Sequence, residues 1–380
     1  MSKIEVLHLV DTYLPLTMRW LEQMMALTEV RCSHAMYADH YICEPPPVRR
    51  TINFSRISAY PLSWRVRFQR WLQRPEPGNG ILRGYALIHV HFGHMALRHA
   101  EFLLNCGIPF CISLYGFDYE YLVQRNPKTL EGYRRLAEGG GVFIVEGNYS
   151  RSLLISYGIP AESISIVHML FDRGPMVQML PAGGLLRLVQ LATFNEKKNQ
   201  LGVLEALRTR HAGKFSFTFY GESNDRSYYR EIAGWVRSHP EHSVVLRGSL
   251  DEGHYLQAIR HAHWSVQWSR RTERGDTEGG CPVFLKDSLA LGRPVMASPH
   301  CDIPDLLVHG YNGLLAVEGD EEALTAQYDF LLRCPPKQQA EFQKNAWHSV
   351  HANAGSRLSA TETLGVYKGL VGQGNVIRTL

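Results

Sequence analysis

The segment 276–313 of this 380-residue chain has the highest density of residues that could do chemistry. It opens with the acid Glu278, continues with a loop of small residues at 279–282, and then enters an apolar run of helical spacing that contains Asp287. The first amides of a helix have no partner within the helix, and the helix dipole favours negative charge there. Such a loop offers amides to a phosphate and two carboxylates to the hydroxyls of a sugar. The amides expected to bind the phosphate are those of Gly280, Cys281 and Val283.

Pro282 suits the first turn of the helix expected after this loop, because its missing N–H costs nothing at that position. The alternative is a Gly/Pro turn that only caps a surface helix. The spacing alone favours neither interpretation.

Lys198 is a second candidate, in the stretch 194–199 (FNEKKN) that follows the strand-like run 185–191. A lysine after the first strand of a domain, at the start of a helix, is well placed to bind a diphosphate. The alternative is a lysine that simply faces solvent.

Two polar motifs in the first half of the chain follow expected strands. They are HVHFG at 89–93 and SLYGFD at 113–118, and the carboxyl ends of strands are where open α/β sheets bind ligands. His89 and His91 lie two apart and share one face of a strand. No third ligand at suitable spacing is evident, so we expect no metal site. The alternative for His91 is a hydrogen-bonded polar residue at the end of a strand.

Short apolar runs alternate with segments of helical period along the chain, which predicts parallel strands joined by helical crossovers. The expected strands are 4–10, 32–37, 86–92, 109–115, 142–145, 164–168, 185–191, 215–220, 243–246, 264–268 and 294–297. The expected helices are 18–28, 95–105, 149–157, 201–208, 228–237, 251–261, 283–291, 321–333, 337–353 and 356–371.

The alternation breaks once, at 172–184, a run with two prolines and three glycines and no clear period. We interpret it as a linker between two domains, a number that the length also favours. The first domain is then 1–171 with a tail helix at about 356–380, and the second is 185–355.

Composition excludes several classes of protein. With 45% apolar and 11% aromatic residues the chain is neither disordered nor fibrous, and no apolar stretch approaches the ~18 residues of a membrane span. The N-terminal residues do not resemble a secretory signal. The seven cysteines form no CxxC pair, so we expect reduced thiols and a cytoplasmic protein.

The segment 276–313 resembles the donor-site signature of family 4 glycosyltransferases, which are retaining enzymes of the two-domain GT-B fold. That signature has two acids separated by seven residues around a Gly-Pro loop, then A-x-G-x-P-V and a later I-P-E. The matching residues are Glu278, Gly279, Cys281, Pro282, Ala290, Gly292, Pro294, Val295, Ile303, Pro304 and Asp305. Strict counting places Lys286 at the second acid, whereas one extra loop glycine brings Asp287 there. The resemblance, strongest to polysaccharide-biosynthesis members, implies that Glu278 contacts the transferred sugar and Asp287 the ribose.

Other family elements are matched in part. The G-R-x-x-x-x-K-G element, which holds the donor's diphosphate, aligns its lysine with Lys198 but its arginine with Thr193. The candidates to replace that arginine are Arg270, Arg271 and Arg274, with Arg274 placed at the donor. The acceptor-side motifs H-x-H-F-G and F-H-G-x-D imply roles for His91 as a catalytic residue and for Tyr115 and Asp118 at the acceptor, although Tyr115 stands where the family has histidine. In the loop 12–19, Thr17 is a further acceptor-side candidate.

The resemblance implies an α/β fold with two Rossmann-like open parallel-sheet domains facing a cleft (GT-B), and a C-terminal helix that crosses back to the first domain. It implies a hexosyltransferase-type enzyme that moves a sugar from a nucleotide-sugar to a hydroxyl of a glycan or lipid-linked glycan, with retention of configuration. No metal and no cofactor are expected. The alternatives are a sugar-nucleotide epimerase of the same fold and a catalytically weak binding subunit.

The charge pattern adds one expectation. Seven arginines and no acid lie between Pro45 and Pro75, and 64–74 (WRVRFQRWLQR) sets aromatic residues on one helical stripe and arginines on the other. This is typical of a helix that rests on anionic headgroups, so we expect peripheral contact with the inner leaflet of the cytoplasmic membrane. A core-packing helix with a solvated arginine face is the alternative. No nucleic-acid motif accompanies the arginines, and no nucleic-acid partner is expected.

Overall fold

The computed structural model describes residues 3–13, 15–41, 50–53, 84–170, 172–180, 184–208, 211–351 and 356–377. Two compact units form: Met1–Met169 together with Ser356–Leu380, and Leu170–Gly355. The arginine-rich segment 64–74 lies outside the described residues, so its expected helix remains a prediction. Among the helices that are described, none combines the length and the apolar character needed to cross a membrane.

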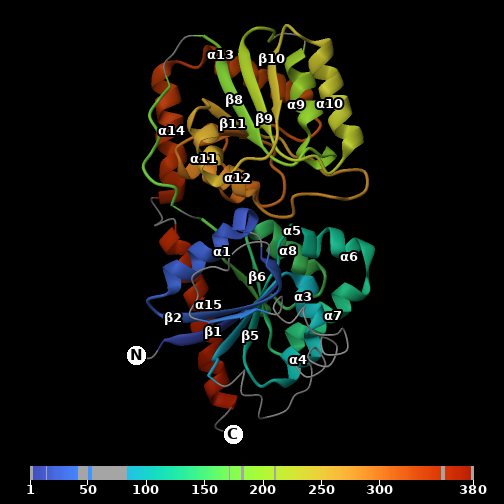
Figure 1. The fold of residues 1–380 in the computed structure, drawn as a ribbon, viewed down its shortest axis with the longest axis vertical. Helices are drawn as coiled ribbons and strands as arrows, with labels where there is room; N and C mark the ends of the chain where they lie inside the picture. Colours follow the sequence, from blue (N-terminus) through green and yellow to red (C-terminus); the bar gives the residue numbers. More distant parts are fainter. Residues whose placement is uncertain are drawn as a thin grey trace. The chain divides into compact units, whose positions relative to one another are not determined.

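The first unit is built on a parallel sheet of seven strands in the order β3-β2-β1-β4-β5-β6-β7. Figure 1 labels β1, β2, β5 and β6 of this sheet. Its strands are β1 (Ile4–Tyr13), β2 (Cys32–Tyr41), β3 (Arg50–Asn53), β4 (Leu87–His91), β5 (Phe110–Ser113), β6 (Val142–Val145) and β7 (Ile164–Ile166). Its helices are α1 (Pro15–Thr28), α3 (Gly93–Arg98), α4 (Ala100–Asn105), α5 (Gly116–Tyr119), α6 (Tyr121–Arg125), α7 (Lys128–Glu138), α8 (Asn148–Ser156), the 3₁₀ turn η2 (Ala161–Ser163) and α15 (Ser356–Ile377).

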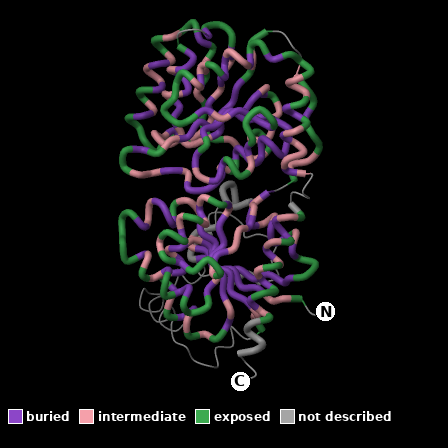
Figure 2. The backbone as a smooth tube through the Cα atoms, turned by 180° about the vertical axis from the view of Figure 1, so that it is seen from behind, coloured by how far each residue is buried: buried purple, intermediate pink, exposed green. Residues whose placement is uncertain are grey.

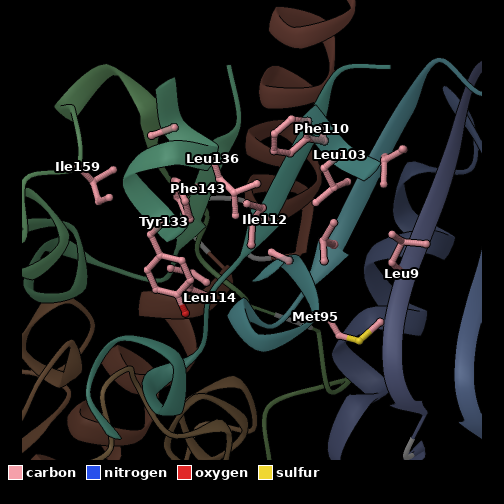
Figure 3. Close-up of a cluster of buried hydrophobic side chains, with 14 of the residues drawn as sticks. Leu9, Met95, Leu103, Phe110, Ile112, Leu114, Tyr133, Leu136, Phe143 and Ile159 are labelled. Atoms are coloured by element: carbon pink, nitrogen blue, oxygen red, sulfur yellow. The ribbon is translucent and has the colours of Figure 1, made fainter. Parts of the chain in front are cut away.

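The two faces of this sheet are covered by different helices. Leu9, Ile112 and Phe143 lie on one face in a cluster with side chains of α3, α4 and α7, and Figure 3 shows part of it. The opposite face holds Val6 and Leu87 against side chains of α15, which is the tail helix. Since strand residues alternate between faces, His8, His89 and His91 lie on this second face.

The second unit is built on a parallel sheet of six strands in the order β10-β9-β8-β11-β12-β13. Its strands are β8 (Leu186–Leu191), β9 (Phe215–Tyr220), β10 (Ser243–Arg247), β11 (Trp264–Gln267), β12 (Val295–Ala297) and β13 (Gly313–Leu315). Its helices are η3 (Glu196–Lys198), α9 (Gln200–Arg208), α10 (Arg226–Ser238), α11 (Glu252–Arg260), α12 (Val283–Ala290), η4 (Ile303–Asp305), α13 (Glu321–Arg333) and α14 (Pro336–His351). Figure 2 shows that buried residues concentrate along the central strands of each unit.

Residues 172–180 of the expected linker pack on the second unit, so this part is not the free linker that its composition suggests. The backbone N–H of Val177 donates to the carbonyl of Leu291 at 3.0 Å, and the Val177 side chain is buried in an apolar cluster of that unit. The guanidinium of Arg293 donates to the carbonyl of Gln178 at 3.0 Å. These contacts satisfy backbone groups that glycine and proline leave out of regular structure.

Both sheets share the doubly wound order in which the first strand lies beside the fourth. This confirms the two Rossmann-like parallel-sheet domains and the return of the C-terminal helix to the first unit. In such sheets the chain reverses its winding direction between the first and fourth strands, and ligands bind at the carboxyl ends of the strands there. These switch points lie between β1 and β4 in the first unit and between β8 and β11 in the second.

Candidate functional site

In the second unit, Lys198 and Glu278 meet beside the switch point. Lys198 ends η3, just after β8, and Glu278 lies in the loop between β11 and α12. The ammonium of Lys198 donates to both carboxylate oxygens of Glu278, at 2.7 and 2.6 Å. The carboxylate also accepts from Gln267 Nε2 at 3.0 Å and from Ser269 Oγ at 2.5 Å. The two predicted donor-site residues thus form one hydrogen-bonded cluster.

The turn that carries Lys198 is fixed by its neighbours. The Asn195 side chain accepts from the backbone N–H of Lys198, and Gln190 Nε2 donates to the backbone carbonyl of Lys198. Asn199 then adopts a left-handed φ of 53°, which asparagine tolerates better than most residues. These contacts hold the lysine side chain against the strand end.

Glu278 stays charged although it is almost buried: only 8% of its side chain is exposed. Burial by itself would raise the pKa of the carboxyl, but the charges of Lys198 and Lys197 and the hydrogen bonds from Lys198 and Ser269 outweigh it. The net effect lowers the pKa below its ordinary value of 4.5. A buried carboxylate with directed donors is suited to accept hydrogen bonds from sugar hydroxyls.

Of the arginines considered for the missing clamp, Arg270 lies closest in structure to the lysine turn. Its backbone N–H donates to the carbonyl of Lys197 at 2.9 Å, and its guanidinium pairs with Glu196 at 2.8 Å. Arg274, the predicted donor contact, is exposed on the following turn.

A threonine–histidine–glutamate row next to Glu278 escapes the sequence motifs. His300 Nε2 is hydrogen-bonded to the Thr277 hydroxyl, and His300 Nδ1 lies 3.1 Å from a carboxylate oxygen of Glu318. The backbone N–H of Glu278 points at the same Nε2, at 3.4 Å. The row holds Thr277 and the backbone N–H of Glu278. Only the fold could reveal it, because its members are 18 to 41 positions apart.

The loop before α12 is built of buried small residues. Gly280 and Cys281 are buried. Pro282 is the N-cap of α12, one position before the first turn in which it was expected. Gly279 adopts a φ of 73°, a conformation that a side chain would strain.

Asp287 on α12 is almost fully buried and already paired. Its carboxylate accepts from Arg173 Nε at 2.6 Å and from the Tyr255 hydroxyl at 3.0 Å. Burial first, and then the charge of Asp287, raises the pKa of Tyr255 well above 10. Neither partner was foreseen from the sequence, because Arg173 lies in the expected linker and Tyr255 belongs to no motif.

In the first unit, Asp118 ties two strand-end loops together. Its fully buried carboxylate accepts from the backbone N–H of Gly93 and of Tyr115, both at 2.9 Å. Burial raises its pKa to about 7, against the lowering effect of these backbone donors. Phe92, just before Gly93, has a φ of 76°, a strained value for a residue with a side chain. Asp118 therefore positions the β4 and β5 loops.

His91 lies at the end of β4 and is inaccessible to a substrate. Its exposed fraction is 0%, and its ring nitrogens contact Tyr115 Oη at 3.0 Å and His8 Nδ1 at 2.9 Å. Burial lowers its pKa well below 6.5. Its partner Tyr115 is half-buried. Thr17 lies in the first turn of α1, and its side chain is outside the description.

The fold brings a third histidine, His8, to the pair His89 and His91, and one nitrogen of each lies within 4.8 Å of the others. The sequence could not reveal this, because the strand of His8 lies far away in the sequence although it pairs with β4 in the sheet. His8 Nδ1 and His91 Nε2 are 2.9 Å apart, whereas ligands of tetrahedral zinc are separated by about 3.3 Å. Both nitrogens of every ring have a hydrogen-bonding partner. The set fits a hydrogen-bond network better than a metal site.

Comparison with known proteins defines the class to which the second unit is similar. Residues 186–334, which contain Lys198, Glu278, Asp287 and His300, match the family model described as "Glycosyl transferases group 1". The chain is also 30% identical over 177 residues to the amylovoran biosynthesis glycosyltransferase AmsK of Erwinia amylovora. That alignment covers 46% of this chain and 43% of the relative.

The putative colanic acid biosynthesis glycosyltransferase WcaL of Salmonella typhimurium is 27% identical over 198 residues, 51% of this chain and 48% of the relative. The chain thus matches somewhat less than half the length of each of these two relatives. HepE of Anabaena, solved with UDP and with UDP-glucose, shares the fold with TM-scores of 0.73 at 14–15% identity, covering 97% of this chain and 100% of HepE. The sucrose-phosphate synthase of Thermosynechococcus elongatus aligns with a TM-score of 0.74 at 15% identity over 98% and 100% of the two chains. These likenesses confirm the GT-B fold class.

Proposed function

We propose that the protein is a retaining glycosyltransferase that moves a sugar, of hexosyl type, from a nucleotide-sugar to a hydroxyl of a glycan or lipid-linked glycan. The observation that carries the proposal is the buried Lys198–Glu278 pair at the switch point of the second sheet. The pair lies inside the segment that matches the glycosyltransferase family model. HepE, of the same fold, binds UDP and UDP-glucose, which supports a nucleoside diphosphate as the donor's leaving group.

Each residue of the cluster then has a distinct task. Lys198 exchanges its contact with Glu278 for the donor's diphosphate and balances the charge that grows on the leaving group. Glu278, still held by Gln267 and Ser269, accepts hydrogen bonds from hydroxyls of the transferred sugar. Asp287 binds the ribose, with Arg173 and Tyr255 as its positioning partners. The backbone amides of Gly280, Cys281 and Val283 complete the phosphate contacts.

We propose that retention arises by front-face attack, in which the departing phosphate takes the proton of the acceptor hydroxyl. The acceptor oxygen forms the new bond to the anomeric carbon as the bond from that carbon to the diphosphate oxygen breaks. Lysine, arginine and loop amides supply the positive charge, so the reaction is expected to need no metal ion.

The acceptor is proposed to bind at the carboxyl ends of β4 and β5, near Tyr115 and Asp118. Aromatic rings gather there: Phe92 lies 4.7 Å from Tyr115, and Phe117, 51% exposed, stacks on Tyr121 at 5.4 Å. Exposed aromatic rings beside polar groups suit the apolar faces and hydroxyls of sugars. The relatives named for amylovoran and colanic acid biosynthesis support a glycan as the acceptor. That this glycan is lipid-linked, with 64–74 in contact with the cytoplasmic membrane, is part of the proposal.

The epimerase alternative gains no support from these relatives, which are named glycosyltransferases. Turnover in the transfer assay would exclude a binding subunit without activity.

The test is transfer from a panel of UDP- and GDP-sugars to lipid-linked glycan, with the anomer of the product read by NMR. Glu278→Gln keeps the shape of the side chain and its contacts with Gln267 and Ser269, and we expect it to lower kcat by about 10²–10³-fold. Glu196→Gln, which removes a more exposed carboxylate nearby, is the matched control and should keep its activity. An inverted anomer would refute retention, and an active Glu278→Gln variant would refute the assigned site.

A further inference from the structure

A row of buried histidines lies on the face of the first sheet that α15 covers. His34 comes from β2, His8 from β1, and His89 and His91 from β4, with exposed fractions of 6%, 0%, 2% and 0%. His8 and His89 are partners in the parallel register. Four imidazoles in one apolar layer need internal hydrogen-bond partners, because buried polar groups are costly when unpaired.

Three of these histidines form an unbroken chain between a threonine and a tyrosine. The Thr28 hydroxyl contacts His34 Nε2 at 3.0 Å, and His34 Nδ1 contacts His8 Nε2 at 2.9 Å. His8 Nδ1 contacts His91 Nε2 at 2.9 Å, and His91 Nδ1 contacts the Tyr115 hydroxyl at 3.0 Å. His89 stands beside the chain, with Tyr367 and Ser113 as its own partners.

The inner end gives the chain a direction. The Thr28 hydroxyl lies 2.8 Å from the carbonyl oxygen of Met24 and 3.2 Å from that of Met25, and a carbonyl can only accept. The single hydroxyl hydrogen of Thr28 is therefore used inside α1. Thr28 must accept from His34, so His34 carries its proton on Nε2.

Burial makes this direction propagate. It lowers the pKa of His34 to about 4 and that of His8 and His91 well below 6.5, so the rings are neutral and each has one donor and one acceptor. With Nε2 of His34 protonated, its Nδ1 accepts from His8 Nε2–H, and His8 Nδ1 accepts in turn from His91 Nε2–H. His91 Nδ1 is then left to accept from the hydroxyl of Tyr115.

We propose that Thr28, His34, His8 and His91 form a directional hydrogen-bond chain that turns the Tyr115 hydroxyl hydrogen into the protein. The phenol oxygen is thereby presented as an acceptor for a hydroxyl group of the acceptor sugar. This assignment of ligand chemistry rests on the proposed function, whereas the direction of the chain does not. The chain ends on a backbone carbonyl, which takes no proton at neutral pH, so it orients Tyr115 and moves no proton.

The surroundings of Tyr115 match this role. It follows β5, it is half-buried, and the rings of Trp20 and Phe92 lie 4.9 and 4.7 Å from its own. Asp118 fixes its backbone N–H. Tyr115 also has a side-chain hydrogen bond with Ser113. A phenol held by stacking, by its hydrogen bond to His91 and by the contact with Ser113 presents its remaining lone pair in a defined direction, which suits selection among hydroxyl groups.

The direct test is the tautomeric state of the histidines in the full chain, read from ¹⁵N–¹H correlation spectra of histidine-labelled protein at pH 7.5. We expect neutral rings protonated on Nε2 for His8, His34 and His91. Thr28→Val removes the hydroxyl that accepts from His34 and leaves the backbone carbonyl of Met25 as its other acceptor, so we expect a fraction of the protons on all three rings to shift to Nδ1 together. Thr363→Val removes another buried hydroxyl of the same unit, one bonded to Ser359 at 2.8 Å, and should leave the tautomers unchanged.

Three spectroscopic or analytical results would overturn the chain: a wild-type ring protonated on Nδ1, an imidazolium at pH 7.5, or a stoichiometric zinc ion in the purified protein. Thr28→Val spectra equal to those of Thr363→Val would do so as well.

The functional arm uses the transfer assay. We expect Thr28→Val and Tyr115→Phe to raise the KM for the acceptor about tenfold, the effect of one lost hydrogen bond, with the donor KM unchanged. An unchanged acceptor KM in Tyr115→Phe would refute the sugar contact while the tautomers still report on the chain. Absence of any transfer in the wild type would instead refute the proposed function.

Discussion

Removing the positive charge of Lys198 should expose how Glu278 is kept ionised. Lys198→Met preserves the length of the side chain but deletes both hydrogen bonds to the carboxylate and its nearest cation. The Glu278 side chain is 8% exposed and that of Lys198 16%. Losing one partner of a buried pair costs about 3–5 kcal/mol in folding free energy, and we expect the lower end because Lys198 is partly hydrated. Ser269, Gln267 and the charge of Lys197 offset part of the loss.

The loss should depend on pH. In the wild type the lowered pKa of Glu278 contributes stability that is present above its unfolded pKa and is lost as the pH falls through the folded value. In Lys198→Met, burial is no longer outweighed, and the pKa of the carboxyl rises above 4.5. Protonation of Glu278 then removes the unpaired buried charge of the variant. The loss in unfolding free energy relative to the wild type should therefore be largest near pH 7.5 and shrink toward pH 4.5.

Urea unfolding followed by pulsed hydrogen exchange, with peptides of the second unit analysed separately, gives the free energy at both pH values. Lys198→Met combined with Glu278→Gln should recover most of the stability, because no buried charge remains unpaired. Arg208→Met, which breaks an exposed pair with Glu205, is the control and should have little effect. A deficit equal at both pH values and not rescued by Glu278→Gln would refute the reasoning.

Four further outcomes are expected. Tyr367→Phe leaves Nδ1 of buried His89 without its partner at 2.7 Å and should cost about 1–3 kcal/mol in unfolding of the first unit alone. Gly93→Ala should abolish soluble expression, because its Cβ would lie 1.8 Å from Tyr133 Oη, whereas Gly365→Ala, with open space around it, should raise Tm. The folded pKa of Asp118, about 7, lies above its unfolded value, so wild-type stability should fall from pH 4 to 7, and Asp118→Asn should flatten that slope in urea titrations. EDTA should leave sugar transfer unchanged, and lost activity restored by Mg²⁺ would contradict the metal-free proposal.

The regular alternation of apolar runs was sufficient to predict the two parallel sheets, because buried parallel strands and their crossover helices differ so clearly in period. The same pattern could not reveal that 172–180 packs on the second unit. Its prolines and glycines were interpreted as a linker, yet Val177 is buried there and Arg173 reaches Asp287. Local composition describes backbone freedom and contains no information on distant partners.

In the candidate site, too, the sequence revealed the residues that belong to local motifs and missed those that depend on tertiary contacts. Lys198 and Glu278 were chosen from short motifs, and the fold brings them into contact because both follow neighbouring strands. His300, Glu318 and Tyr255 belong to no motif, and only the tertiary contacts associate them with the site. The pattern H-x-H drew attention to His91 as a catalytic residue, but its complete burial and its contact with His8 depend on a strand more than 80 residues away.

The two sheets carry different kinds of polar groups around their switch points, charged ion pairs in the second unit and neutral histidines in the first. In the second unit, the strand ends beside β8 and β11 hold Lys198, Lys197, Glu278 and Asp276 as ions paired across two loops. At the corresponding place in the first unit, burial keeps the imidazoles neutral, and hydrogen bonds between uncharged rings replace ion pairs. In a charged cluster, a lysine can exchange its carboxylate partner for an anionic ligand at a small net cost in free energy. The ion pair that is lost and the ion pair that is gained have similar electrostatic energies. A neutral chain cannot offset an anion's charge, but it can fix the direction of one hydroxyl. The contrast supports the proposal that a phosphate-bearing ligand binds the second unit and an uncharged hydroxyl the first, as the proposed sugar transfer requires.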